Sequence, residues 1–390
     1  MKLVIQNPQV KKMTGTNNVK VSVVIKYGEG ECNELWYIIP SQFEDYLSYE
    51  VADAYVVAFL LYAMQRNLDI ETDMPVSSRL LAMLNKYLVP FICEINEKMH
   101  PIQIFAKESN EVFKGSHCGT GISCGVDSLS TVVYHGIDET INNRRLDTLT
   151  LLNTGYYGHN NGNSEHYKSY IHQSEQFCKE FGFGFLTVDS NVSNLTQYDF
   201  LSAHTYLTCS TILLLQKYFR LYYYASGYPV YDFEANFKDP AYYDTFLLNC
   251  ISTESLEFLS SCCIFSRVKK TSVIAKHPDI IKHLYVCLSG DSSHNCSCCE
   301  KCIRTMLALE AIGETDTIKE IFDYSIYKKN RNRYFSYMLR HKKNNPYYRE
   351  IFDEMKRNKR SIPFLAYINI IPCSFELSAL YHRFKGILNV

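Results

Sequence analysis

Apolar residues recur along the first part of the chain with two different periods, which predict strands and helices. Alternation indicates strands at Val19–Tyr27, Glu34–Ile39 and Ile102–Ala106, whereas helical spacing covers Val51–Asn67 and Val76–Glu97. This mixture predicts a small α+β module over residues 1–115.

From residue 116 onward, short β-rich runs alternate regularly with helical stretches. The pairs are Leu149–Asn153 with Ser164–Phe181, Phe185–Val188 with Thr205–Phe219, and Leu221–Ala225 with Tyr242–Leu259. Such alternation predicts a doubly wound, Rossmann-like parallel sheet over residues 116–312, with ligands beyond the carboxyl ends of its strands. A helical region rich in basic and aromatic residues is expected over 313–390.

Composition narrows the class of protein. The chain of 390 residues is 46% hydrophobic and 21% charged, which is enough apolar surface for a core and excludes wholesale disorder. With a net charge of −1, the chain lacks the overall positive charge typical of nucleic-acid-binding proteins. Any contact with nucleic acid must therefore be local. The longest apolar runs, such as Tyr55–Met64, are too short to span a membrane, and no signal peptide is recognisable. A cytoplasmic protein is expected.

Residues 123–128 (SCGVDS) lie between a predicted strand and the apolar helix Leu129–His135. Small residues let backbone N–H groups converge on an anion, and the helix start adds unpaired amides. Ser123 and Ser128 contribute hydroxyl groups, and Asp127 could hold magnesium or order the loop. The Walker and dinucleotide-binding patterns are both absent. The segment is a candidate phosphate loop, and an ordinary capped helix start is the alternative.

Five of the fifteen cysteines crowd into one stretch, and four of them follow the pattern C-x8-C-x2-C-x2-C. The four are Cys287, Cys296, Cys299 and Cys302, and Cys298 is left over. Four thiolates with no open position predict a structural zinc site. An iron–sulfur cluster is the alternative, but a fourth cysteine and a proline would follow it downstream, whereas here a helix is predicted over Ile303–Ile312. Five buried cysteines without a ligand are the remaining reading.

Together the two motifs resemble a known family. The loop is similar to the Ser-Gly-Gly-x-Asp-Ser loop of the ATP pyrophosphatase (PP-loop) superfamily, with Cys124 in place of the first glycine. The cysteine pattern before the last helix resembles that of the 7-cyano-7-deazaguanine synthase (QueC) family. Residues 157–159 (YGH) with Glu165, and residues 242–244 (YYD) after Asp239, resemble further family segments. The likeness covers about His117 to Gly313.

The resemblance implies an adenine nucleotide alpha hydrolase-like fold and an ATP-dependent carbon–nitrogen ligase that forms AMP. The expected cofactors are ATP, Mg²⁺ and Zn²⁺, and the expected substrate is 7-carboxy-7-deazaguanine. The acceptor would be ammonia or a protein amine, as in the enlarged QueC-like proteins of anti-phage operons. The implied catalytic residues are Asp127, Ser128 and His159; the nucleotide contacts are Ser123, Cys124, Gly125, Val126, Asp127, Ser128, Asn153 and Gly227; the substrate contacts are Tyr157, Glu165, Asp239 and Asp244.

Departures from the family leave alternatives open. His159 stands where the family has glutamine, no Gly-Arg-Asn triplet occurs near Ser202–Thr205, and Thr245 follows Asp244 in place of cysteine. A tRNA-modifying PP-loop enzyme is one rival, with the basic and aromatic segment between Asp323 and Glu350 as the RNA contact. A zinc-stabilised protein that holds nucleotide without turnover is the other.

Overall fold

The computed structural model describes residues 1–28, 31–155, 165–287 and 294–368. The chain divides into two compact units. The sheet unit comprises Met1–Ile122 and His135–Cys263, and the helical unit comprises Ser123–Tyr134 and Ile264–Val390. This division differs from the three segments expected from the sequence, because residues 1–115 share one sheet with the parallel strands that follow.

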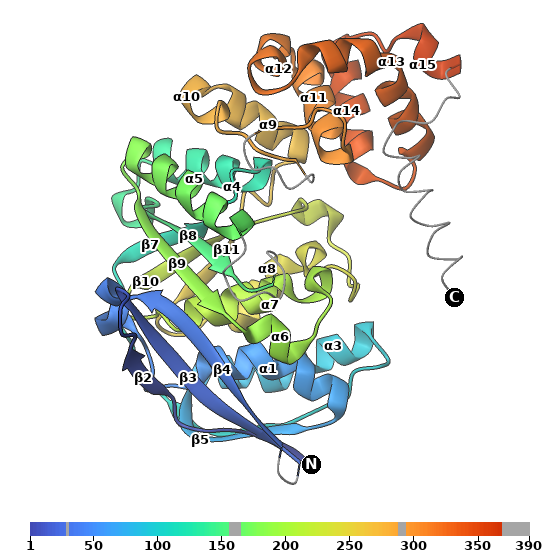
Figure 1. Cartoon of the computed structure of the whole chain (residues 1–390). Helices are drawn as coiled ribbons and strands as arrows, with labels where there is room; N and C mark the ends of the chain where they lie inside the picture. Colours follow the sequence, from blue (N-terminus) through green and yellow to red (C-terminus); the bar gives the residue numbers. More distant parts are fainter. Residues whose placement is uncertain (29–30, 156–164, 288–293, 369–390) are drawn as a thin grey trace. The chain divides into compact units, whose positions relative to one another are not determined.

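Within the described residues, one eleven-stranded sheet forms the framework of the sheet unit (Figure 1). Ten strands lie side by side in the order β11 (Glu257–Ser261), β10 (Phe219–Ala225), β7 (His117–Gly121), β8 (Thr148–Asn153), β9 (Gly184–Ser190), β4 (Glu31–Pro40), β3 (Asn18–Tyr27), β1 (Lys2–Ile5), β5 (Asp69–Ser77) and β6 (Ile104–Ser109), and β2 (Gln9–Lys12) pairs with β3. The five strands from β11 to β9 are mutually parallel, so the expected α/β class with a parallel sheet is confirmed.

The strand order reverses between β7 and β10. After β7 the chain adds β8 and β9 on one side, and then returns to add β10 and β11 on the other. The carboxyl ends of β7 and β10 are therefore neighbours, and the chain leaves them in opposite directions. Open α/β sheets bind ligands in the crevice at such a reversal.

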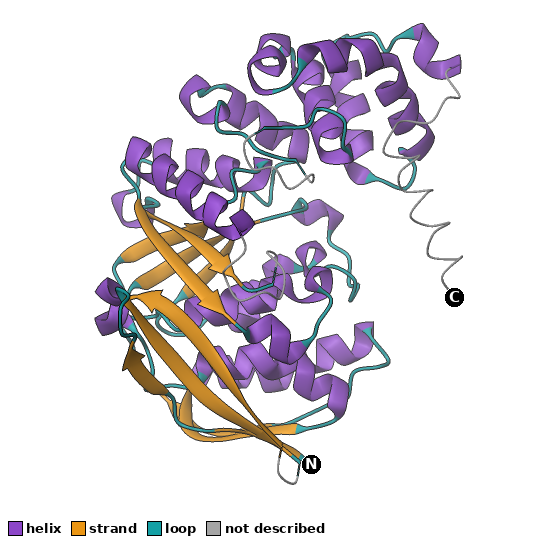
Figure 2. Cartoon of the chain, viewed as in Figure 1, coloured by secondary structure: helices purple, strands orange, loops and turns teal. Residues whose placement is uncertain are grey.

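Helices lie against both faces of the parallel strands, whereas β3 and β4 have helices on one face (Figure 2). They are α1 (Asp53–Arg66), α2 (Ser78–Met83), α3 (Val89–Ile95), α5 (Glu165–Phe181), α6 (Val192–Thr196), α7 (Phe200–Leu213) and α8 (Asp244–Ile251). Because βαβ connections are almost always right-handed, the reversal of strand order places α5 on one face of the parallel strands and α7 and α8 on the other. Helix α1 is apolar on all sides, which is why it lies buried along nearly its whole length and packs against α7.

The N-terminal strands extend the parallel sheet through β4. Tyr37 and Ile38 of β4 pair antiparallel with Ser190 and Asp189 of β9. Just beyond β9, the Asn191 side chain accepts a hydrogen bond from the Trp36 backbone N–H at 2.8 Å. The α+β character expected for this part is present, but its strands belong to the common sheet.

Several predicted elements have different bounds. The helix expected over Val76–Glu97 begins at Ser78 and widens into a π-turn at Leu84–Leu88, just before Pro90 of α3, which cannot donate to the helical ladder. The helix expected over Tyr242–Leu259 was wrong in its second half, because α8 ends at Ile251 and β11 follows. Strand β5 was missed, since Pro75 interrupts its alternation at a shift of register.

The described helices of the helical unit are between 4 and 18 residues long. They are α4 (Val126–Val132), α9 (Arg267–Ala275), α10 (Pro278–Ile281), α11 (Glu300–Ile312), α12 (Thr315–Ile321), α13 (Tyr324–His341), α14 (Pro346–Arg357) and α15 (Phe364–Ile368). Helix α11 contacts α9, α12, α13 and α14, so it is the central element of this unit. The chain beyond Gly313 is helical up to Ile368, as expected. Among the residues that the structure describes, every helix is too short or too polar to cross a bilayer.

Candidate functional site

The predicted phosphate loop forms a tight turn that leads into α4. Ser128 Oγ lies 3.2 Å from Ser123 Oγ and donates to the carbonyl of Gly125 at 3.2 Å. The backbone N–H of Gly125 in turn donates to Ser123 Oγ at 3.4 Å. The two serines therefore close the loop on itself, and the first amides of α4 follow directly. Unpaired amides at a helix start are groups that can bind an anion.

Cys124 has left-handed backbone geometry, with a φ of +53°. Most residues other than glycine avoid this region, and the loop that this segment resembles has glycine at this position. Burial raises the pKa of the Cys124 thiol to about 12, so the group stays protonated at neutral pH. Cys124 is therefore a small residue in a tight turn and not a nucleophile.

Asp127 makes ion pairs with two cations of α9. Its Oδ2 lies 2.5 Å from Arg267 Nη1, and its Oδ1 lies 3.3 Å from Lys270 Nζ. Burial alone would raise the pKa of this carboxyl, but the positive charges of Arg267 and Lys270 outweigh it and lower the pKa. Of the two roles expected for Asp127, this arrangement matches the ordering of the loop, because both carboxylate oxygens already have cationic partners.

Further basic groups lie near Asp127 and its two cationic partners. Arg304 of α11 lies over the ring of Tyr347, with its guanidinium carbon 4.3 Å from the ring centroid, and Arg267 lies over the same ring at 5.5 Å. Burial, followed by repulsion from Arg267 and Arg304, lowers the pKa of the Lys301 ammonium. Four cations thus gather near the loop within one unit, and such a cluster favours an anionic ligand.

The four cysteines expected to bind metal come together. The Sγ atoms of Cys287, Cys296, Cys299 and Cys302 all lie within 4.8 Å of one another, and those of Cys296 and Cys302 are 3.9 Å apart. Four Zn–S bonds of about 2.3 Å arranged in a tetrahedron place the sulfurs roughly 3.8 Å apart. The cluster therefore fits a metal ion such as zinc, and it excludes Cys298, as predicted.

The chemistry of the thiols points the same way. Burial raises the pKa of Cys296 to about 12, and contact with Cys299, followed by burial, raises the pKa of Cys302. Four thiolates so close together repel one another, and a divalent cation removes that repulsion. The backbone N–H groups of Cys296 and Cys299 donate to the sulfurs of Cys287 and Cys296 at 3.4 and 3.3 Å, as around metal-bound sulfur.

Two polar side chains hold the cysteine segments in place. Asn295 accepts from the backbone N–H of Val286 at 2.9 Å and donates to the carbonyl of Leu284 at 2.8 Å. The carbonyl of Ser297 accepts from the hydroxyl of Tyr334 on α13 at 3.0 Å. The cluster thus connects α11 with the C-terminal helices.

Three predicted site residues lie at the carboxyl side of the parallel strands. Asn153 ends β8 and donates to Asp189 at 2.8 Å. Gly227 follows β10, where an added Cβ would lie 3.2 Å from that of Ala241. Asp239 accepts from the backbone of Ala241 at 2.9 Å.

Asp244 is buried and accepts from Ser260 Oγ at 2.9 Å, so it supports the junction of α8 and β11. Tyr157 and His159 lie outside the described residues. Glu165 begins α5, and its side chain is likewise outside what the structure describes.

Three residues beside these sites were missed in the sequence. Arg267 and Lys270 are one turn apart on α9, and no local pattern in the sequence marks them as partners of a loop about 140 residues earlier. His204 of α7 bonds Asp239 and Tyr224, although it is an isolated histidine in an apolar helix. The one sequence signal is its position in the segment Ser202–Thr205, where the family that this sequence resembles has a Gly-Arg-Asn triplet.

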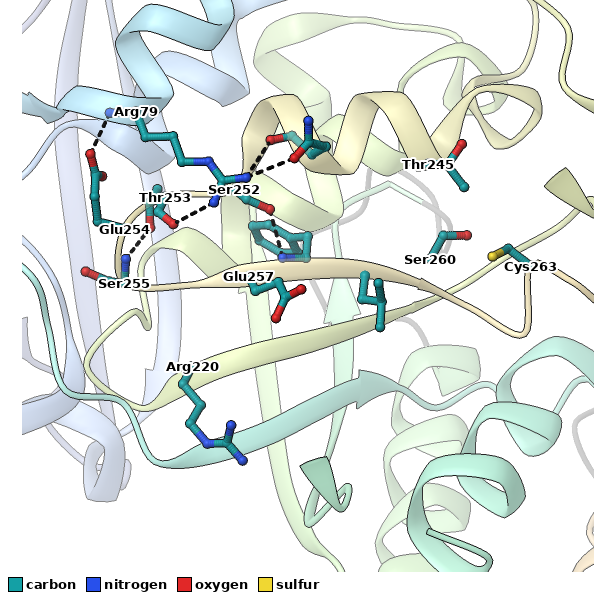
Figure 3. A pocket seen from close by; sticks show the side chains of 13 residues that line it. Arg79, Arg220, Thr245, Ser252, Thr253, Glu254, Ser255, Glu257, Ser260 and Cys263 are labelled. Carbon is teal, nitrogen blue, oxygen red and sulfur yellow. Dashed lines mark hydrogen bonds between the residues drawn. The ribbon is translucent and has the colours of Figure 1, made fainter. Parts of the chain in front are cut away.

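A hollow of about 380 Å³ lies along β11 (Figure 3). Arg79, on its wall, donates to Asn249 and to the carbonyl of Thr253. Arg220, also on the wall, donates to the carbonyl of Ser116 at 3.2 Å. None of the predicted site residues lines this hollow. Its two arginines thus make hydrogen bonds to backbone and side-chain oxygens of the fold.

The basic segment of the tail also makes internal contacts. Arg331 of α13 forms an ion pair with the buried carboxylate of Glu310 in α11, which also accepts from the hydroxyl of Tyr327. Within the part of the chain that the structure describes, this arginine therefore connects α13 to α11.

Comparisons with protein-family models, curated proteins and solved structures found no match to this chain.

Proposed function

We propose that this protein is a QueC-like, ATP-dependent ligase that adenylates a carboxylate, 7-carboxy-7-deazaguanine, and transfers the acyl group to a nitrogen nucleophile. The observation that carries the proposal is the loop of residues 123–128, which turns at a left-handed Cys124 and leads into α4 beside Arg267 and Lys270. The strand reversal next to β7 and the four-cysteine cluster support it. The cluster would hold zinc as a structural ion.

In the first step, a carboxylate oxygen of the substrate attacks the α-phosphorus of ATP, and the bond from that phosphorus to the bridging oxygen breaks. Pyrophosphate leaves with the electron pair. The loop amides, the hydroxyls of Ser123 and Ser128, and the charges of Arg267 and Lys270 would stabilise the negative charge that develops.

In the second step, an amine nitrogen attacks the acyl carbon, loses a proton, and AMP leaves. No side-chain nucleophile is needed, which agrees with the high pKa of Cys124.

The described residues around the loop do not form a ready magnesium site. Both oxygens of Asp127 contact cations. Mg²⁺ would instead enter on the phosphate oxygens of ATP, as it usually does in such enzymes. Asp127 then acts by fixing Arg267 and Lys270 beside the loop.

The resemblance assigns substrate contacts to Tyr157, Glu165, Asp239 and Asp244, and a catalytic role to His159. The burial of Asp244 and its bond to Ser260 favour a supporting role for that residue. The acceptor would be ammonia or a protein amine, with anti-phage defence as the family setting. A tRNA substrate is less favoured, because Arg331 is engaged with Glu310.

A nucleotide-binding protein without turnover is the second candidate. It is favoured by one observation, the ion pairing of Asp127 by two cations, which leaves no carboxylate oxygen of this loop ready for a metal.

The test is to incubate the protein with ATP, Mg²⁺ and 7-carboxy-7-deazaguanine, with and without ammonia, and to resolve the products by mass spectrometry. Ser128→Ala should lower AMP formation by about 100-fold, because it removes a donor at the leaving group. Ser130→Ala is the matched control on the same helix, since its hydroxyl bonds the carbonyl of Asp127, and it should retain wild-type activity. Wild-type activity of Ser128→Ala would contradict the loop assignment. ATP binding without AMP formation would favour the second candidate.

A further inference from the structure

A chain of polar side chains connects α7, β10 and the segment before α8, all within the sheet unit. His204 Nδ1 lies 2.6 Å from the hydroxyl oxygen of Tyr224, and its Nε2 lies 3.2 Å from Asp239 Oδ1. The side chains of His204 and Asp239 are only 18% and 14% exposed. Both ring nitrogens of the histidine are therefore engaged inside the protein.

The hydroxyl groups fix where the protons are. Thr205 Oγ1 donates to the Tyr224 oxygen at 3.1 Å. Burial raises the pKa of Tyr224 well above its ordinary value of 10, so this residue keeps its proton and donates to His204 Nδ1. The histidine proton then lies on Nε2, where it is donated to Asp239.

This arrangement leaves one carboxylate oxygen of Asp239 open. Oδ1 accepts from His204 and from the backbone N–H of Ala241 at 2.9 Å, so it has two donors. Oδ2 accepts no hydrogen bond from the residues that the structure describes. Nearby in the chain, the rings of Tyr228 and Tyr242 stack with centroids 3.8 Å apart. A fixed carboxylate acceptor in a segment with stacked aromatic rings suits a planar heterocycle that carries N–H groups.

We propose that His204 and Tyr224 are positioning residues that hold Asp239 as a fixed acceptor for the ring N–H groups of the heterocyclic substrate. The inference rests on the proposed function, and it adds how this chain recognises an aminopyrimidinone ring without the family's triplet. Fixing the carboxylate before binding lowers the entropy cost of the contact. Neither residue touches the phosphates or the reacting carboxylate in this scheme, so both should affect heterocycle binding and leave ATP binding unchanged.

The test is calorimetric titration of the full chain with 7-carboxy-7-deazaguanine and, separately, with ATP. His204→Phe should weaken binding of the acid by about tenfold or more and leave ATP binding unchanged, because Asp239 loses a charge-assisted bond. His204→Gln can both accept from Tyr224 and donate to Asp239, so it should restore binding to within about threefold. Asp239→Asn should match His204→Phe. His172→Phe, at an exposed position of α5, is the control and should bind as wild type.

A second measurement does not depend on substrate. Nitrogen NMR of His204 should show the proton on Nε2, and Tyr224→Phe should shift the ring toward a mixture of tautomers. If His204→Phe does not fold, Tyr224→Phe takes its place in the titrations, with the same expected selective loss.

Acid binding by the wild type that is unaffected in His204→Phe, or a proton found on Nδ1, overturns the inference alone. Failure of the wild type to bind the acid overturns the proposed function as well.

Discussion

The sheet unit and the helical unit are stabilised in different ways. In the sheet unit, one apolar cluster includes residues from Leu3 to Phe258, among them most of α1. In the helical unit, the short helices also meet at directional contacts, which are the four-cysteine cluster, the Asp127 ion pairs and the Glu310–Arg331 pair. Hydrophobic burial tolerates small shifts, whereas metal and ion-pair geometry does not. The residues proposed to act on phosphate lie in the unit with directional contacts. A substitution in one unit should therefore change the stability of that unit and leave the stability of the other unchanged.

The largest expected effect is the loss of metal binding at the four-cysteine cluster. Cys302→Ser should remove the bound ion and destabilise the helical unit by more than roughly 4 kcal/mol, since ion binding contributes to folding. Metal analysis and hydrogen exchange check this, and amides of α1 and β3 should keep their protection. Cys298→Ser is the matched control and should retain the ion. Iron in the purified protein, or loss of the ion in Cys298→Ser, would overturn the ligand set.

Next in size is a cavity in the apolar cluster. Phe59 in α1 is fully buried, and Phe59→Ala should cost the sheet unit about 4 kcal/mol while metal content stays unchanged. Hydrogen exchange in α1 and β3 measures the loss. Phe364→Ala, at a side chain that is 77% exposed, is the control and should change stability by less than about 0.5 kcal/mol. A loss of metal in Phe59→Ala would show that the units do not respond separately.

A smaller effect depends on pH. His135 is buried and stacks on Tyr223, with ring centroids 3.7 Å apart, and burial lowers its pKa to about 4. The unfolded chain binds this proton below about pH 6.5, whereas the folded chain resists it, so stability is complete above 6.5. Between pH 6.5 and 4 the sheet unit should lose on the order of 3 kcal/mol. Denaturant unfolding at several pH values should show this slope, with His135→Phe lacking it and His172→Phe keeping it.

The smallest effect concerns the loop turn. Cys124→Gly should change stability by less than about 1 kcal/mol, because relief of the left-handed backbone offsets the lost burial of the thiol. Cys124→Val, with a β-branched side chain at positive φ, should cost about 2 kcal/mol. Thermal unfolding of the two variants decides the point. Equal stability of both would mean that the turn does not constrain this position.

The sequence predicted well whatever depends on local pattern. The period of Val19–Tyr27 predicted β3, and the apolar run of Val51–Asn67 predicted α1. The metal cluster was also predictable, because three of its four cysteines, Cys296, Cys299 and Cys302, are close together in the sequence at the start of α11. Strand β11 was not, since five residues are too few for their apolar pattern to distinguish a strand from a continuing helix.

Contacts between distant segments could not be predicted from the sequence. The bonds from Asp127 to Arg267 and from His204 to Asp239 join residues far apart in the chain, and no local pattern marks either partner. The pairing of β4 with β9 is of the same kind, and it determines whether residues 1–115 form a separate module. In each case the fold brings the partners together, and residue type alone does not.

The division of the chain has a consequence for biosynthesis. Helix α4 belongs to the helical unit, yet about 130 residues of the sheet unit separate it from α9, its principal partner. At ribosomal speeds of 5–20 residues per second, α4 emerges roughly ten seconds before that partner exists. During this interval its apolar residues, such as Leu129 and Val132, lack their final neighbours and are open to chaperones. The loop of residues 123–128 therefore reaches its final surroundings only after α9 has been synthesised.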